Sequence, residues 1–283
     1  MPHLTLADGD QLYYEAQGSG PPLLLITGVY GLASFWPRAL VDRLAEQYTV
    51  ILHDQRGTGQ SSRSRILYSL AQMCGDVLHL CDGLGIQRAH IVGHSLGGAI
   101  AQTIALDHPE RIDRLILSAT WAGPDPYFQG LIGLRRDMLA RGDWDLYARF
   151  GALLMHPSPW VREHAAERLG PALPAVPDSV SRAIMVERLQ VVLAHDRRAE
   201  LGRVTAVTLV VGARDDIWTP AYLSVELGRL IPDAEILILP EGQHFFPQVV
   251  PQRFAGILHA FLARTPTPAI RPTSVSGPRT QAP

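Results

Sequence analysis

The feature that most restricts the fold of this chain is a repeated alternation of short apolar segments with longer amphipathic ones. The apolar segments are rich in Val, Ile and Leu, which is the pattern of strands buried on both faces of a parallel sheet. Parallel neighbours need a crossover connection, and the amphipathic segments are long enough to supply helices for it. We therefore predict an α/β fold with a mostly parallel central sheet covered by helices.

The predicted elements run from the N-terminus almost to the end of the chain. Two strands in residues 3–17 flank a turn at Asp8, Gly9 and Asp10. The other predicted strands are residues 22–27, 49–54, 89–93, 114–119, 207–212 and 234–240. The predicted helices, most of which lie between these strands, are residues 36–47, 70–84, 96–107, 221–230 and 251–263.

One connection is far longer than the others. The strands at 114–119 and 207–212 are separated by helix-like stretches at residues 127–141, 143–155, 160–169 and 178–195. A connection of this length is normally a structured insertion. We predict a core that contains the sheet in residues 1–122 and 204–264, a helical cap in residues 123–203, and a disordered tail rich in Pro, Ser and Thr in residues 265–283.

Composition excludes several classes of function. The formal net charge is -2 and like charges form no block, so we expect neither a nucleic acid nor an anionic membrane as partner. No apolar run approaches the roughly 18 residues that span a bilayer, and the first residues do not resemble a secretory signal. Cys74 and Cys81 do not have the spacing of a redox or zinc site and are predicted to be buried free thiols. These features predict a cytoplasmic protein. They do not indicate an oligomeric state.

Ser95 is the candidate nucleophile. Residues 93–97 read Gly-His-Ser-Leu-Gly, which fits G-x-S-x-G, and they join a predicted strand to a predicted helix. A sharp turn there strains the backbone of the serine, and glycines on either side avoid Cβ clashes between strand and helix. The alternative is a chance group of glycines around a serine that caps a helix, but the position between strand and helix favours the catalytic interpretation.

A serine nucleophile needs a base, an acid that orients the base, and donors for the oxyanion. His244 follows a predicted strand and is the candidate base, whereas His259 falls inside a predicted helix. Asp215 and Asp216 follow the preceding strand, and the order Ser, Asp, His is that of α/β-hydrolases. Spacing does not separate the two aspartates; we lean slightly to Asp215 as the triad acid.

The oxyanion hole is predicted to combine two backbone N–H groups, those of Leu96 and Val29. Val29 lies in the glycine turn of residues 27–31, after the strand at 22–27. We expect an apolar substrate pocket bordered by Tyr30, Trp36, Trp121, Trp218 and Phe245.

Arg135 and Arg136 lie in a predicted cap helix. They could bind a substrate carboxylate, but a solvated helix face is the explanation that we favour. The sequence contains no phosphate-binding glycine loop and no metal-ligand cluster, so neither a cofactor nor a metal is implied.

With these residues in place, the chain resembles the α/β-hydrolase superfamily from about Leu4 to Ala263. Residues 51–62, "ILHDQRGTGQSS", resemble the family's D-x-R-G-x-G-x-S loop, in which the residues corresponding to Asp54 and Arg56 brace the structure. Within the superfamily the chain resembles small-molecule members, namely aminoacrylate hydrolases and 3-oxoadipate enol-lactonases. It departs from the superfamily at Thr27, where a histidine usually begins the oxyanion loop.

These observations together predict a serine hydrolase that cleaves a small-molecule carboxylic ester, lactone or related acyl bond through an acyl-enzyme. The alternatives are a C–C bond hydrolase or an acyltransferase on the same scaffold. A third is a ligand receptor that keeps the triad without turnover.

Overall fold

A computed structural model describes residues 2–169 and 178–264 of the chain and confirms the predicted α/β architecture. In these residues an eight-stranded sheet has the order β1-β2-β4-β3-β5-β6-β7-β8. The strands are β1 His3–Thr5, β2 Gln11–Gln17, β3 Pro22–Ile26, β4 Thr49–His53, β5 Ala89–His94, β6 Ile112–Ser118, β7 Val207–Ala213 and β8 Glu235–Leu239.

The direction of the strands decides where the site can form. β1 and β2 pair antiparallel, β2 pairs antiparallel with β4, and every pair from β4 to β8 is parallel. The carboxyl ends of β3, β5, β7 and β8 therefore meet at one edge of the sheet. The loops carrying residues 27–31, Ser95, the two aspartates and His244 all begin at this edge.

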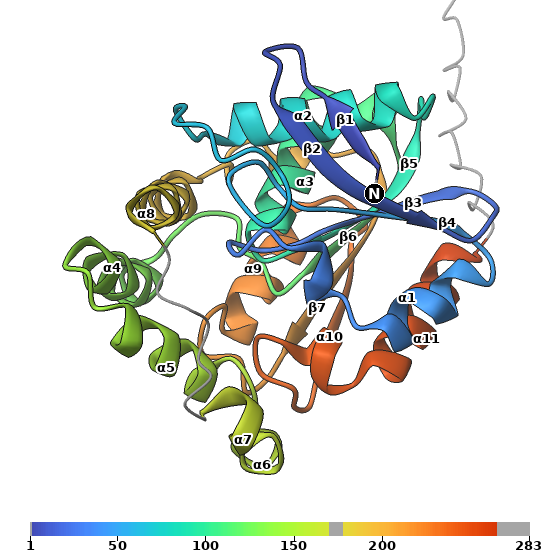
Figure 1. Cartoon of the computed structure of the whole chain (residues 1–283). Coiled ribbons are helices and arrows are strands. Elements are labelled where there is room, and N and C mark those ends of the chain that lie inside the picture. Colours follow the sequence, from blue (N-terminus) through green and yellow to red (C-terminus); the bar gives the residue numbers. More distant parts are fainter. Residues whose placement is uncertain (1, 170–177, 265–283) are drawn as a thin grey trace, which may run out of the picture.

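Helices cover both faces of the sheet (Figure 1). α1 (Arg38–Ala45) and α11 (Pro251–Leu262) pack on one face, where they form one apolar cluster with β3, β4 and β7. α2 (Leu70–Gly83), α3 (Leu96–Asp107) and α9 (Ala221–Leu230) belong to the cluster on the other face. Their apolar side chains close the core on both sides of the strands.

The long connection between β6 and β7 is helical, and its helices lie together beyond one end of the sheet (Figure 1). The predicted helix at residues 160–169 is two short helices in the structure. The boundaries between core and cap at residues 122–123 and 203–204 remain predictions. The predicted tail at residues 265–283 lies outside the described residues.

The helices of the connection are α4 Pro126–Ala140, α5 Trp144–Leu154, α6 Ser158–Glu163, α7 Ala165–Arg168 and α8 Ser179–Ala194. The remaining helical elements are α10 Phe246–Val249 and the 3₁₀ turns Ala33–Phe35, Pro109–Arg111 and Leu201–Arg203.

Side-chain caps explain where three of these helices begin. Ser69 accepts a hydrogen bond from the backbone N–H of the third residue of α2, and Asp125 does the same at α4. Asp178 accepts from Ser181 N at 2.7 Å at the start of α8. Each such cap satisfies an amide that has no intrahelical acceptor and is typically worth about 1 kcal/mol.

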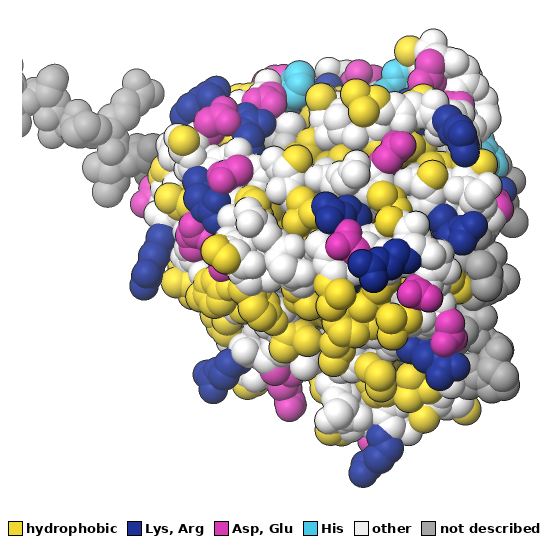
Figure 2. All heavy atoms as spheres, turned by 90° about the vertical axis from the view of Figure 1, so that its left-hand side faces the viewer, with side chains coloured by type: hydrophobic (Ala, Val, Ile, Leu, Met, Phe, Trp, Pro, Cys, Tyr) yellow, Lys and Arg dark blue, Asp and Glu magenta, His cyan; other side chains and the backbone are white. Residues whose placement is uncertain are grey.

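Figure 2 shows the side of the molecule on which α4 and α8 lie in Figure 1. Positive and negative side chains are interspersed on this face, and hydrophobic side chains gather between them. The exposed apolar residues of α4 and α5 include Leu134, Leu146 and Leu153, each about half exposed. None of the described helices is both long enough and apolar enough to cross a bilayer.

Cys74 and Cys81 are buried free cysteines, as predicted. Burial raises the pKa of the Cys74 thiol to about 12 and that of Cys81 to about 11. Because the thiolate is the reactive form, neither cysteine is activated as a nucleophile.

Two buried histidines should make the fold sensitive to acid. Burial lowers the pKa of His53 and of His195 to about 4, from 6.5 in an unfolded chain. Above pH 6.5 both states are neutral at these groups, so they do not affect stability. As the pH falls from 6.5 to 4, only the unfolded state takes up these protons, so the free energy of unfolding should fall by roughly 3 kcal/mol per histidine.

Denaturant unfolding measured between pH 7.5 and 4.5 tests this expectation. The variants His53→Gln and His195→Gln should each show a shallower loss of stability than the wild type over this range. Equal slopes in the wild type and both variants would contradict the assignment.

Candidate active site

Ser95 lies at a strained turn between β5 and α3. Its φ is 55° and its ψ is −119°, a conformation that non-glycine residues rarely adopt. Two hydrogen bonds from neighbouring segments hold this turn. Ser95 N donates to Ser118 O at 2.9 Å, and Thr120 Oγ1 donates to Ser95 O at 2.9 Å. Strain of this kind persists only where the surroundings over-determine it, which is typical of functional sites.

The glycines on either side of Ser95 are required by close backbone contact. A Cβ on Gly93 would lie 2.4 Å from Gly97 O, and one on Gly97 would lie 2.2 Å from Ile26 O. Real Cβ atoms do not approach oxygen this closely, so any other residue would displace the backbone of the turn. The steric reason predicted for these two glycines therefore holds in the structure.

His244 lies beside Ser95, in the loop after β8. Its Nε2 is 3.1 Å from Ser95 Oγ, and its Nδ1 is 2.9 Å from Asp216 Oδ2. The carboxylate can only accept a hydrogen bond, so Nδ1 carries the ring proton and Nε2 is left to accept from the serine hydroxyl. Both His244 and Asp216 are buried, which favours a fixed geometry. Ser95, His244 and Asp216 thus form one continuous hydrogen-bonded chain.

Asp216, and not Asp215, is the aspartate that faces the imidazole. Its Oδ1 accepts from Trp218 N at 2.7 Å and from Thr219 N at 3.0 Å, and its Oδ2 accepts from Thr219 Oγ1 at 2.7 Å. These donors hold the carboxylate in one orientation while Oδ2 faces His244 Nδ1.

Asp215 points to the loop that carries the histidine. Its two oxygens accept from Gly242 N at 3.1 Å and from Gln243 N at 2.9 Å. Gly242 and Gln243 both have positive φ, at 133° and 53°, so this loop is tightly turned. The slight preference for Asp215 as the partner of the histidine is therefore opposite to the observed placement, because Asp215 is occupied by these two amides.

His94 is a second imidazole in the site, and it is fully buried. Its Nδ1 is 3.1 Å from Ser118 Oγ, its ring stacks on Phe35 with centroids 4.8 Å apart, and its ring centroid is 5.1 Å from that of His244. Burial lowers the pKa of His94 well below 6.5, and the adjacent His244 lowers it further. His94 is therefore neutral and does not oppose a positive charge on His244.

The loop after β3 lies against the serine. A Cβ on Gly28 would lie 3.0 Å from Ser95 Cβ, which is tighter than most real Cβ contacts, so a larger residue would push the loop and the serine slightly apart. Gly31 N donates to Gly28 O at 3.0 Å, which fixes the peptide plane that also bears the Val29 N–H. Leu96 is the first residue of α3, where backbone N–H groups have no intrahelical acceptor.

Two side chains that the sequence analysis missed support this loop. Gln55 Nε2 donates to Thr27 O at 2.8 Å, and Arg188 Nε, from α8, donates to Val29 O at 2.8 Å. Arg188 Nη2 also donates to Gln55 Oε1, which links the two supports. Burial lowers the pKa of Arg188 to about 10, so it stays charged at neutral pH.

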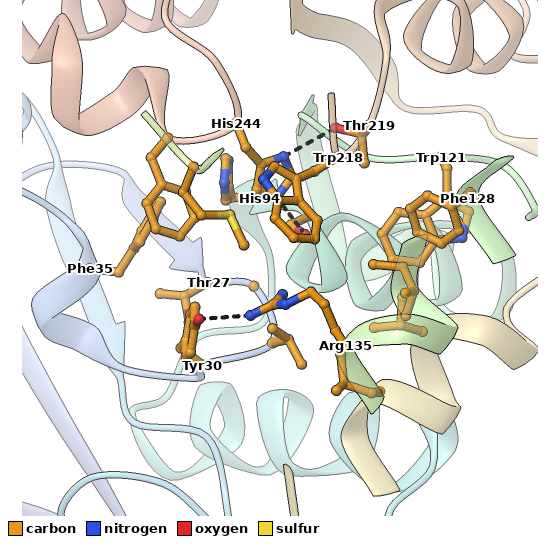
Figure 3. Close-up of a pocket in the computed structure, with 18 residues that line it drawn as sticks. Thr27, Tyr30, Phe35, His94, Trp121, Phe128, Arg135, Trp218, Thr219 and His244 are labelled. Atoms are coloured by element: carbon orange, nitrogen blue, oxygen red, sulfur yellow. Dashed lines mark hydrogen bonds between the residues drawn. The ribbon is translucent and has the colours of Figure 1, made fainter. Parts of the chain in front are cut away.

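A pocket lies over Ser95. Figure 3 shows aromatic side chains, His244 and Arg135 around it. The pocket lies between the sheet edge and the helices of the long connection, and its wall is largely apolar. It is lined by Thr27, Gly28, Val29, Tyr30, Phe35, His94, Ser95, Trp121, Phe128, Ile132, Arg135, Met155, Leu189, Val192, Trp218, Thr219, His244 and Phe245.

Four of the five residues expected at the pocket line it, namely Tyr30, Trp121, Trp218 and Phe245. Trp36 does not. It is 2% exposed and packs edge-on against Phe35, in the apolar cluster with α1 and α11. The expectation for Trp36 is corrected because Phe35, its neighbour in the chain, is the residue that faces the pocket.

Several lining residues had no sequence signal. Phe128, Ile132, Met155, Leu189 and Val192 come from the helices of the long connection or from the residue after α5. Their apolar character fits any helix packed on a core, and only the docking of these helices identifies which side chains face Ser95. In the part of the chain that the structure describes, no group of three or more His, Cys, Asp or Glu side chains could hold a metal ion.

Comparisons with known proteins agree with this architecture. A sequence model of the alpha/beta hydrolase fold matches residues 21–155. The "Putative carbamate hydrolase RutD" of Azorhizobium caulinodans is 35% identical to the chain over 261 residues, which are 92% of this chain and 98% of that protein. The crystal structure of a hydrolase from Pseudomonas aeruginosa is 30% identical, with a TM-score of 0.78 over 93% of this chain and 98% of the other. The enol-lactonase from Burkholderia xenovorans has a TM-score of 0.80 at 23% identity, over 93% of this chain and 100% of the other.

Proposed function

This chain is a hydrolase that belongs to the α/β-hydrolase family, and on that premise we propose that it is a serine hydrolase of small carboxylic esters, lactones or related acyl compounds. Ser95 is the nucleophile, His244 the general base and Asp216 the residue that orients His244. The observation that carries the proposal is the chain of contacts from Ser95 Oγ to His244 Nε2, at 3.1 Å, and from His244 Nδ1 to Asp216 Oδ2, at 2.9 Å.

The first half of the reaction acylates the serine. His244 Nε2 takes the proton of Ser95 Oγ as the oxygen attacks the carbonyl carbon of the substrate. Asp216 stabilises the imidazolium that forms and keeps the ring in its orientation. The tetrahedral intermediate then collapses, and the leaving alcohol takes the proton from Nε2, so that an acyl-enzyme and a neutral His244 remain.

The second half returns the enzyme to its starting state. His244 Nε2 takes a proton from a water molecule, which attacks the acyl carbon. The second tetrahedral intermediate releases the carboxylic acid, and Ser95 Oγ recovers its proton from His244. In both halves the oxyanion is stabilised by the backbone N–H groups of Val29 and Leu96, each worth roughly 3 kcal/mol in related sites.

The same site could attack other carbonyl compounds. A relative is named as a carbamate hydrolase, and a carbamate carbonyl would be attacked by the same steps. C–C bond hydrolysis of a vinylogous diketone and acyl transfer to another acceptor are alternatives on this scaffold. Loss of the visible absorption of a coloured diketone substrate would identify the C–C reaction.

Turnover of p-nitrophenyl acetate, p-nitrophenyl butyrate and a panel of lactones tests the proposed function. We expect steady-state release of nitrophenol well above the uncatalysed rate for at least the small esters. A well-folded protein that turns over no member of the panel would contradict the proposal and favour a ligand receptor. Labelling by a fluorophosphonate would not separate these two cases, because a receptor that keeps the triad could also react once.

A further inference from the structure

Arg135 is a buried cation in the pocket that also contains Ser95. It comes from α4, only 2% of it is exposed, and it lines the pocket together with Ser95 and His244. Figure 3 shows its guanidinium reaching toward Tyr30 across the pocket from α4. The expectation of a solvated helix face is therefore wrong for Arg135. Arg136, its neighbour, is partly exposed and pairs with Asp137 at 2.7 Å.

Among the residues that the structure describes, no carboxylate pairs with Arg135. Its Nη2 donates to Tyr30 Oη at 2.8 Å, and its Nε is buried with no hydrogen-bond partner in the described residues. Aromatic rings surround the charge, with ring centroids of Tyr147 at 4.4 Å and Trp218 at 4.7 Å from Cζ. Burial raises the pKa of Tyr147, so its phenol is neutral and does not balance the guanidinium.

The other fully buried arginine beside the pocket shows what a structural role looks like. Arg188 is equally inaccessible, but its guanidinium donates to Val29 O, Gln55 Oε1 and Arg56 O. Those acceptors compensate for the loss of water. Among the described residues, Arg135 has only the Tyr30 hydroxyl and the aromatic rings as partners. Burying a charge without an opposite charge is costly.

We propose that Arg135, together with Tyr30, binds a carboxylate of the substrate while Ser95 attacks a different carbonyl of the same molecule. This inference rests on the proposed function and deepens it, because it makes the substrate an ester, lactone or related acyl compound that also carries a carboxylate. Both residues line one pocket, as binding of a single substrate by both groups requires.

The chemistry around Arg135 favours a carboxylate over a phosphate. A guanidinium forms two parallel hydrogen bonds to a planar carboxylate, and the buried Nε is a donor available for one of them. The remaining wall is apolar, and no second cation that lines the pocket in the described residues would balance a doubly charged group. The apolar wall matches the hydrocarbon between the carboxylate and the reacting carbonyl.

Binding to the full-length Ser95→Ala protein tests the subsite without turnover. The probes are the monoethyl esters of malonate, succinate, glutarate and adipate, each compared by calorimetry with the ester in which a carboxamide replaces the carboxylate. The carboxamide has the same size and no charge. At the best chain length we expect the carboxylate to bind about 10- to 100-fold more tightly, the range typical of hydrogen bonds to a charged group.

Variants of Arg135 then test whether this residue causes the preference for the carboxylate over the carboxamide. Arg135→Gln in the Ser95→Ala background should remove it, and Arg135→Lys should retain only part of it, because lysine keeps the charge and loses the planar fork. Arg136→Gln is the matched control on the same helix and should keep the full preference. Circular dichroism shows whether Arg135→Gln folds. If it does not, a reduced carboxylate preference in Arg135→Lys is the result that tests the proposal.

Two results would overturn the subsite. One is equal affinity for the carboxylate and carboxamide at every chain length, and the other is an undiminished preference in the Arg135 variants. The proposed function is tested separately, by measuring the turnover of neutral esters by the protein that retains Ser95. A protein that hydrolyses neutral esters without any carboxylate preference would refute the subsite alone.

Discussion

Replacing Ser95 with alanine is expected to lower kcat by about four to six orders of magnitude on the best ester substrate, while KM changes little. The hydroxyl is the only atom group that the variant loses, and its Oγ lies 3.1 Å from His244 Nε2. The pocket wall that binds the substrate is unchanged, so the loss should fall on the chemical step. Steady-state kinetics on freshly purified wild type and variant, with both protein concentrations determined by absorbance, measures the effect.

Two control experiments test whether the loss of turnover is specific to Ser95. Ser224→Ala removes a hydroxyl from a fully buried serine, in α9 and outside the pocket, and should keep kcat within a few-fold of the wild type. His244→Ala should cost about as much as Ser95→Ala, and the double variant little more, because the groups act as one unit. A Ser95→Ala protein that retains near wild-type turnover would refute the nucleophile assignment.

The second large effect separates the two aspartates. Asp216→Asn should lower kcat by about ten-thousandfold, because a neutral amide cannot stabilise the imidazolium and can hold the ring in the wrong tautomer. Asp215→Asn should lower kcat by about tenfold or less. The carboxylate of Asp215 accepts hydrogen bonds from the backbone of Gly242 and Gln243 and does not face the imidazole.

Stability gives an independent readout for this pair. Asp215→Asn loses charge-assisted hydrogen bonds from two amides, so the free energy of unfolding should fall by about 1–3 kcal/mol. Kinetics and denaturant unfolding on both variants provide the comparison. A larger loss of kcat in Asp215→Asn than in Asp216→Asn would reverse the proposed roles.

The two buried arginines have different consequences for specificity. Arg188 supports the loop that carries the proposed oxyanion donor, and it does so from α8, a helix of the long connection. Arg135 lies in the pocket itself and, as proposed, selects substrates with a carboxylate. The helices of this connection would therefore influence both the reaction rate, through residues 27–31, and the choice of substrate.

Much of the fold could be predicted because strand and helix periodicity is a local property. β3 and β7 are buried along nearly their whole length, and their sequences read as continuous apolar runs. The turn at Ser95 was also visible, since only glycine tolerates the backbone contacts at residues 93 and 97. The split of the predicted helix at residues 160–169 into α6 and α7 was not visible, because its composition suits one helix as well as two.

The partner of His244 could not be read from the chain. Asp215 and Asp216 are adjacent and chemically identical, and their side chains leave the backbone in different directions. Asp216 meets Thr219 and His244, whereas Asp215 meets the amides of the histidine loop. The choice depends on how the loops after β7 and β8 pack together.

By itself, the sequence determined the class of fold, the sharp turn at Ser95 and the set of polar residues at the ends of the strands, because these follow from local patterns and steric limits. Only the tertiary structure decided that Asp216 faces His244, that Phe35 rather than Trp36 faces the pocket, and that Arg135 is buried beside Ser95. The physical reason is that burial and side-chain direction depend on contacts between segments far apart in the chain. Arg135 and Arg136 are neighbours in one helix, and the surface against which α4 packs gives them opposite surroundings.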